Sequence, residues 1–289
     1  MSSASMSPEP PDPRLNWLGL SQAERDAAYD NNAAVKNSAE LIAERNRLSA
    51  AARAAARGAL LDVPYGDKER TKFDLYPAAE PSAPCLVFIH GGYWQRNSRE
   101  FFAIIVEGFA ANGWAVAIPG YSLAPQATLT EIVQEMRQAL DWLAANGRAY
   151  GLNGPALLAG WSAGAQLTAM ALDHPRVAAG LAISGVYDLA PIRQTSLNAA
   201  LSLTDEEIAS LSPLQRPVIH KPLAIAYGSA ELPVFVHDAR NFHRLRAAAG
   251  APGELIAIDG ADHFTILDQF RRPDGALVAA ARALIEPSR

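Results

Sequence analysis

The chain has 289 residues, 49% hydrophobic and 19% charged, which is enough to bury the core of one large domain or two small ones. The net charge of -5 is spread over both signs, with no basic stripe for nucleic acid and no polybasic segment for a membrane surface. These features favour a small, uncharged or amphiphilic ligand.

The single cysteine, Cys85, stands in an apolar run and is interpreted as a core residue, so neither a disulfide framework nor a cysteine-based metal site is available. The N-terminus carries no charged segment followed by an apolar one, and the most apolar stretch, residues 101–120, is interrupted by Glu107 and contains Pro119. We therefore expect a cytoplasmic protein without a metal or cofactor, with a homodimer left open.

Residues 1–13 are rich in Ser and Pro, and we predict a disordered tail that extends to residue 16. Ser21 and Glu24 have the spacing of a capping box. The Ala, Glu and Arg rich stretch that follows predicts a helix to about Arg57, ended by Gly58.

From there to the C-terminus, short β-like runs alternate with helical segments, which predicts one α/β domain over 17–289. Several runs are continuously apolar, as in strands buried on both faces of a sheet. We expect a mostly parallel, eight-stranded sheet covered by helices on both faces, with the first two runs as an antiparallel hairpin at one edge. The predicted strands are LLDVPY, KFDLY, CLVFI, WAVAI, ALLAGW, LAIS, LAIAY and ELIAI, and the helices are about 98–111, 127–146, 163–173, 235–249 and 275–285.

Functional groups in such a sheet collect at the carboxyl ends of the strands. The run ALLAGW leads into the motif Gly160, Trp161, Ser162, Ala163, Gly164. This is the GxSxG pattern of a nucleophile elbow, in which a tight strand-to-helix turn presents a serine hydroxyl. Ser162 is therefore the predicted nucleophile.

A serine nucleophile needs a base, and the base needs an acid to orient it. His263 follows the last strand, where this topology places the base. Glu231, after the strand LAIAY, fits the acid best, and Asp188, after the preceding strand, is the rival. Asp262 adjoins the base in sequence, and neighbouring loop residues seldom have the geometry to hydrogen-bond the imidazole correctly. Four other histidines, His174, His220, His237 and His243, are expected to pack or face solvent.

Attack on a carbonyl produces an oxyanion that backbone N–H groups must stabilise. One donor is expected from Ala163 and others from the loop HGGYW, where Gly91 and Gly92 let the amides turn inward. His90 is expected to brace this loop. The aromatic residues attached to the catalytic loops, Tyr93, Trp94 and Trp161, are predicted to border the substrate, the first two on the rim of the site.

The segments HGGYW, GWSAGA, SGVYDL, GSAELPVF and DHF together resemble the kynurenine formamidase (arylformamidase) branch of the α/β-hydrolase fold, and YDNNAAV resembles an N-terminal feature of its bacterial members. The resemblance runs from about residue 17 to the end. It implies the same roles for Ser162, Glu231 and His263, and N-formylkynurenine, an intermediate of tryptophan catabolism, as a substrate. Well-known formamidases carry Asp at the position of Glu231, and many bacterial members are general esterases.

Residues 190–217 are long for a connection and are a candidate cap over the site, polar enough to disfavour long-chain lipids. Arg193 on this segment is a candidate partner for a substrate carboxylate, the alternative being a solvated arginine. We expect a hydrolase of small-acyl aryl amides or esters. The alternatives are a general short-chain carboxylesterase, an acyltransferase with the same residues, and a binding protein with an inactive site.

Overall fold

The computed structural model describes residues 13–286. Eight strands form one sheet in the order β1-β2-β4-β3-β5-β6-β7-β8, antiparallel at β1-β2 and β2-β4 and parallel from there on. This confirms the predicted sheet and its edge hairpin. The strands are β1 (Leu60–Pro64), β2 (Lys72–Tyr76), β3 (Cys85–Ile89), β4 (Ala115–Pro119), β5 (Ala156–Trp161), β6 (Val177–Ile183), β7 (Leu223–Gly228) and β8 (Leu255–Ile258).

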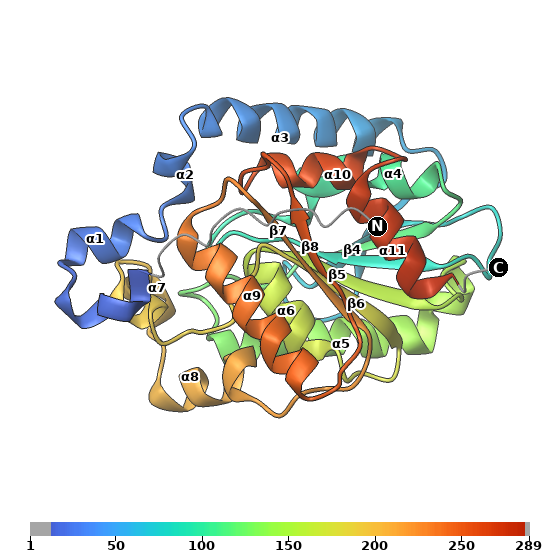
Figure 1. The fold of residues 1–289 in the computed structure, drawn as a ribbon. Helices are drawn as coiled ribbons and strands as arrows, with labels where there is room; N and C mark the ends of the chain where they lie inside the picture. The colour runs from blue at the N-terminus through green and yellow to red at the C-terminus, as the bar shows by residue number, and fades with distance from the viewer. Residues whose placement is uncertain (1–12, 287–289) are drawn as a thin grey trace, which may run out of the picture.

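Helices cover both faces of the sheet (Figure 1). One layer contains α5, α6 and α9, and the other contains α4, α10 and α11 with the long helix α3 outside them. Strands β3, β4, β5 and β7 are buried along their whole length, as their continuous apolar runs predict. The helices of these layers are α3 (Ser38–Ala55), α4 (Val106–Ala110), α5 (Leu129–Asn146), α6 (Ala163–Ala171), α9 (Pro233–Ala248), α10 (Asp268–Arg271) and α11 (Ala276–Ile285).

Short helices gather at one end of the molecule (Figure 1). They come from the N-terminal segment and from the connection between β6 and β7, and they lie beside the carboxyl ends of the parallel strands. They are α1 (Gln22–Ala27), α2 (Asn31–Ala34), α7 (Asn198–Leu201) and α8 (Asp205–Leu211).

The prediction of one continuous N-terminal helix up to Arg57 is wrong, because the stretch contains three separate helices, α1, α2 and α3. The Ser21 capping box is present, but the chain turns after α1 and again before α3. The first turn forms because Asp30 caps α2 through the N–H of Ala33, at 3.0 Å, and because Tyr29 packs its ring against Trp17 and Phe235.

Three smaller differences concern element ends. Of the tail predicted over 1–16, residues 1–12 lie outside the described residues, and residues 13–16 belong to a 3-10 segment, Pro13–Gly19. Strand β6 begins at Val177, four residues before the predicted run. The helix predicted over 98–111 begins as a 3-10 turn, Arg99–Ile105, and continues as α4. Cys85 is buried in the core, as expected.

Candidate active site

Ser162 occupies the turn between β5 and α6 with φ 58° and ψ -121°, a backbone conformation that non-glycine residues rarely adopt. The turn is too crowded for side chains on its neighbours. A Cβ on Gly160 would lie 2.1 Å from the carbonyl oxygen of Gly164, and a Cβ on Gly164 would lie 2.1 Å from that of Ile89. The GxSxG spacing therefore follows from the close approach of three backbone segments.

His263 and Glu231 meet in the interior, with 3.5 Å between Nδ1 of the imidazole and Oε2 of the carboxylate. Both side chains are buried. The second carboxylate oxygen, Oε1, accepts the backbone N–H of Gly228 at 3.1 Å and a short hydrogen bond from the hydroxyl of Ser184. One oxygen is thus held by the protein while the other faces the imidazole.

Ser184 was not singled out in the sequence, although it ends the predicted strand LAIS. It is fully buried, and its positive φ of 53° turns the chain just after β6. The rival acid, Asp188, lies further along the same connection and accepts the N–H of Ala190 at 3.1 Å. At the end of β6, the group that contacts Glu231 is therefore the hydroxyl of Ser184 and not the carboxylate of Asp188.

The Trp161 side chain joins the elbow to the histidine loop. Its indole N–H donates to the carbonyl oxygen of His263 at 2.9 Å, and the two rings are 4.9 Å apart at 38°. The imidazole also packs against Phe235, with 4.6 Å between centroids. These contacts hold the His263 ring next to the elbow.

The loop after β3 is fixed by His90, whose ring is fully buried and stacks on Tyr121 at 4.2 Å. Burial lowers the pKa of His90 to about 3, so the ring is neutral at ordinary pH. In that state Nδ1–H donates to the carbonyl oxygen of Gly91 at 2.9 Å, and Asn97 donates to the same oxygen at 3.1 Å. His90 thus fixes the loop, as expected, through the carbonyl oxygen of Gly91. Asn97 fixes the same oxygen, which the sequence analysis did not predict.

With the Gly91 carbonyl held toward His90 and Asn97, the trans peptide directs the N–H of Gly92 the opposite way. Gly91 itself packs against the elbow, where an added Cβ would lie 2.8 Å from Cβ of Ser162. Ala163 opens α6 immediately after Ser162. Within residues 13–286, no hydrogen-bond acceptor is found for the N–H groups of Gly92 and Ala163.

Trp94 is not on the rim, where the sequence analysis placed it. Its side chain is fully buried, and its indole N–H donates to Gln166 of α6 at 3.1 Å. The positive φ of 58° at Trp94 turns the ring inward, away from the site mouth. The amide of Gln166 in turn donates to the carbonyl oxygen of Leu211 at 2.9 Å. Trp94 therefore anchors the loop and does not line the cavity described next.

A cavity of about 340 Å³ opens beside these residues. His263, Trp161, Gly92 and Tyr93 are among the residues that line it. Ser162 is buried next to Trp161 and is not itself a lining residue. Residues 195–197, from the predicted cap segment, line another side. The sequence analysis did not foresee the wall formed by the N-terminal segment, which contributes Asp26, Tyr29, Asp30, Asn31, Asn32, Ile42 and Arg45.

The Tyr93 hydroxyl connects the loop to this N-terminal wall. It donates to the carbonyl oxygen of Tyr29 at 2.6 Å and accepts from the side chain of Asn31 at 3.3 Å. Burial raises the pKa of Tyr93 well above its usual range, so the hydroxyl keeps its proton. Arg193, in contrast, pairs with Asp205 and is not among the cavity residues, in agreement with the solvated alternative.

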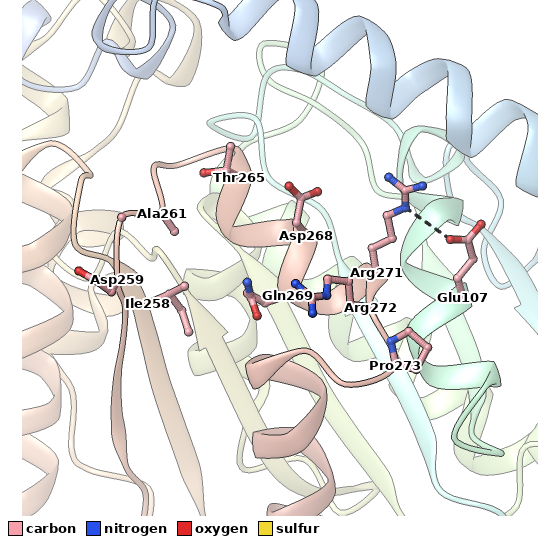
Figure 2. Close-up of a pocket in the computed structure, with 11 residues that line it drawn as sticks. Glu107, Ile258, Asp259, Ala261, Thr265, Asp268, Gln269, Arg271, Arg272 and Pro273 are labelled. Atoms are coloured by element: carbon pink, nitrogen blue, oxygen red, sulfur yellow. Dashed lines mark hydrogen bonds and ion pairs between the residues drawn. The ribbon is translucent and has the colours of Figure 1, made fainter.

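A larger hollow of about 690 Å³ lies on the side of the molecule where β8 meets α10 (Figure 2). Five of its eleven lining residues are charged, and at one end of it Arg271 approaches Glu107 at 3.5 Å. None of the predicted site residues lines this hollow. The larger of the two cavities is therefore not the one beside the proposed catalytic residues.

Comparison with known proteins places the chain in a family. The family model BD-FAE matches residues 73–178. A kynurenine formamidase of Salmo salar is 30% identical over 227 residues, covering 73% of this chain and 76% of the relative. The chain belongs to the kynurenine formamidase-like branch of the α/β-hydrolase esterases.

The chain is also similar to two other proteins. The crystal structure of a candidate thioesterase from Silicibacter sp. tm1040 superposes with a TM-score of 0.80 at 31% identity, and the match covers 90% of this chain and 99% of the other. Esterase LipC of Mycobacterium tuberculosis is 27% identical, over 72% of this chain and 60% of the relative. The protein is thus a hydrolase of the esterase and formamidase type.

Two general features complete the description. No helix within residues 13–286 is long and apolar enough to cross a membrane. In the same part of the chain, no three His, Cys, Asp or Glu side chains lie close enough together to hold a metal ion.

Proposed function

We propose that the protein hydrolyses small-acyl aryl amides or esters through an acyl-enzyme on Ser162, with an activity like that of N-formylkynurenine formamidase. The observation that carries the proposal is the buried Glu231–His263 pair beside the strained serine turn, at a cavity with aromatic walls. The similarity to kynurenine formamidases supports the same substrate class.

In the proposed mechanism, His263 takes the Ser162 proton as the hydroxyl attacks the carbonyl carbon. The tetrahedral oxyanion receives hydrogen bonds from the N–H of Ala163 and from the loop at Gly91 and Gly92. The imidazolium, stabilised by Glu231, then protonates the departing anilide nitrogen, whereas a phenolate leaves without this help. Water, deprotonated by His263, hydrolyses the acyl-enzyme and restores the serine.

The cavity supports a compact substrate, because its 340 Å³ is near the lower end of ligand pockets, roughly 300–1,000 Å³. Tyr93 and Trp161 offer ring surface for an aromatic leaving group. We propose that residues 190–217 act as a cap, contributing Thr195, Ser196 and Leu197 to the mouth. The tight packing of Gly91 against Ser162 leaves little room for a long acyl chain on that side.

The test is a kcat/KM series over acyl lengths of two to twelve carbons on one phenol, with N-formylkynurenine in the same assay. We expect the maximum at four carbons or fewer and turnover of N-formylkynurenine. Ser162→Ala should lower every rate by about 10⁴-fold or more with unchanged circular dichroism. A maximum at eight carbons or longer would contradict the small-acyl assignment.

A general short-chain carboxylesterase is the second candidate, favoured by the similarity to esterase LipC. Ester turnover without turnover of N-formylkynurenine would assign that activity. Alcohol or amine acceptors that divert the acyl group from water would instead reveal an acyltransferase. A binding protein would fail to label Ser162 with a covalent serine probe.

A further inference from the structure

Arg45 of α3 lines the candidate cavity and lies against aromatic rings next to the site. Its guanidinium carbon is 4.4 Å from the centroid of Phe102 and 5.9 Å from that of Trp161. The Trp161 ring in turn contacts His263, with 4.9 Å between centroids. A positive charge is therefore separated from the proposed base by the ring of Trp161.

Two other arginines on this side of the sheet, the half-buried Arg53 and the buried Arg99, have acidic partners. Arg53 and Arg99 both pair with the buried Asp74, at 2.8 and 3.2 Å. Arg45 differs, because it donates only to the neutral side chain of Asn46, at 3.1 and 3.3 Å, and no carboxylate pairs with it within residues 13–286. Arginines removed from water are normally paired, so this one has unused capacity to bind an anion.

Burial lowers the pKa of Arg45 to about 10, which leaves the guanidinium charged at neutral pH. The acids that share the cavity wall are engaged elsewhere. Asp26 accepts the N–H of Ser196 at 2.6 Å, and the exposed Asp30 caps α2. Arg45 thus lines the cavity without a counterion from the acids of its wall.

We propose that Arg45 binds a carboxylate on the leaving group, so that the preferred substrates are aryl amides or esters whose leaving group is an anion. This rests on the proposed function and narrows its substrate class. The planar guanidinium can donate two parallel hydrogen bonds to a carboxylate while its face remains on Phe102. The leaving-group side is the one concerned, because the same cavity exposes His263, which protonates the leaving atom.

The test uses two acetate esters with the same acyl group and the same phenol ring. One is the ester of 3-(4-hydroxyphenyl)propanoate, and the other is the ester of its neutral N-methylamide. We expect the wild type to prefer the anionic ester. Arg45→Gln should lower kcat/KM for the anion by about 10- to 100-fold, mainly through KM, and change that for the amide by less than about threefold. Arg45→Lys should restore part of the preference, because it restores the charge.

Two further arginines serve as comparisons. Arg57→Gln removes an exposed charge outside the cavity and the proposed cap, and it should leave both rates unchanged. Arg96→Gln removes the exposed arginine of the cavity wall and should affect the anion less than Arg45→Gln does. Melting curves establish that each variant is folded.

Three results would overturn the proposal. If Arg45→Gln lowers both rates alike, Arg45 only packs α3 against the rings, and the proposed hydrolysis stands. If Arg96→Gln abolishes the preference and Arg45→Gln keeps it, the carboxylate binds at the rim. If the wild type cleaves neither ester nor N-formylkynurenine, the proposed function fails together with this inference.

Discussion

The carboxyl group of Glu231 has two oxygens with different tasks. Ser184 and the N–H of Gly228 hold Oε1, which leaves Oε2 directed at His263. The longer glutamate side chain is accommodated because a hydroxyl and a main-chain amide fix its far end. A glutamate can therefore take the place that aspartate has in the enzymes this sequence resembles.

We predict that Glu231→Gln lowers kcat by about 10²- to 10⁴-fold, because an uncharged amide does not stabilise the imidazolium. Ser184→Ala should cause a smaller loss, and Asp188→Asn should stay within about threefold of wild type. Steady-state kinetics on one aryl ester gives the ranking. A larger loss for Asp188→Asn than for Glu231→Gln would move the acid to the connection after β6.

Among the structural elements, the loop after β3, helix α6 and the segment before β7 are tied together by one side chain. Gln166 accepts from Trp94 and donates to Leu211, and all three positions are buried or nearly so. Loss of this amide leaves a buried indole N–H and a carbonyl oxygen without partners.

We expect Gln166→Leu to lower the free energy of unfolding by about 2–4 kcal/mol, with a decrease of roughly 5–10 °C in Tm. The matched control is Gln134→Leu, which makes the same substitution at an exposed position of α5 and should change Tm by less than about 2 °C. Thermal unfolding followed by circular dichroism measures both. Equal effects would mean that the bridge contributes nothing.

The strands and the elbow were predictable because their signals are local. Continuous apolar runs reflect burial on both faces, and the glycines around Ser162 reflect contacts within one turn. The fate of Trp94 was not predictable in this way. An aromatic residue next to a catalytic loop can turn either way, and its direction depends on Gln166, which lies 72 positions later in the chain.

The N-terminal wall of the cavity was missed for a related reason. The stretch from Ser21 to Arg57 is rich in Ala, Glu and Arg, and its capping residues Asp30 and Asn37 are the local signal of the two turns. The contacts of Tyr29 with Trp17 and Phe235, which pack the first turn, are tertiary. The motif YDNNAAV did mark the segment, but only as a resemblance, without indicating that its residues reach the cavity.

At the scale of the whole molecule, the buried His90 couples stability to pH. Its pKa is about 3 in the folded protein against 6.5 for an exposed histidine. Because the folded pKa is depressed, the unfolded chain takes up the proton first as the pH falls below 6.5. The free energy of unfolding therefore declines between pH 6.5 and 3.

We expect the His90 contribution to reduce the free energy of unfolding by about 2 kcal/mol between pH 7.5 and 5. Urea unfolding at the two pH values measures the change in wild type and in His90→Asn, which keeps a donor for Gly91. The variant should start less stable but lose less on acidification. The control is His220→Asn, which alters an exposed histidine and should keep the wild-type pH dependence. If His90→Asn also kept the wild-type pH dependence, the His90 ring would not be buried in its neutral form.

Much of the cavity wall comes from other parts of the chain than the proposed catalytic residues. Ser162, Glu231 and His263 follow strands of the central sheet, whereas much of the wall comes from α1, α2, α3 and residues 195–197. Substitutions in these outer segments can alter which molecules are admitted without disturbing bond cleavage. Members of such a family can therefore diverge in substrate specificity through substitutions in the segments that line the cavity. Laboratory evolution of new specificities should begin with libraries at residues 26–45 and 195–197.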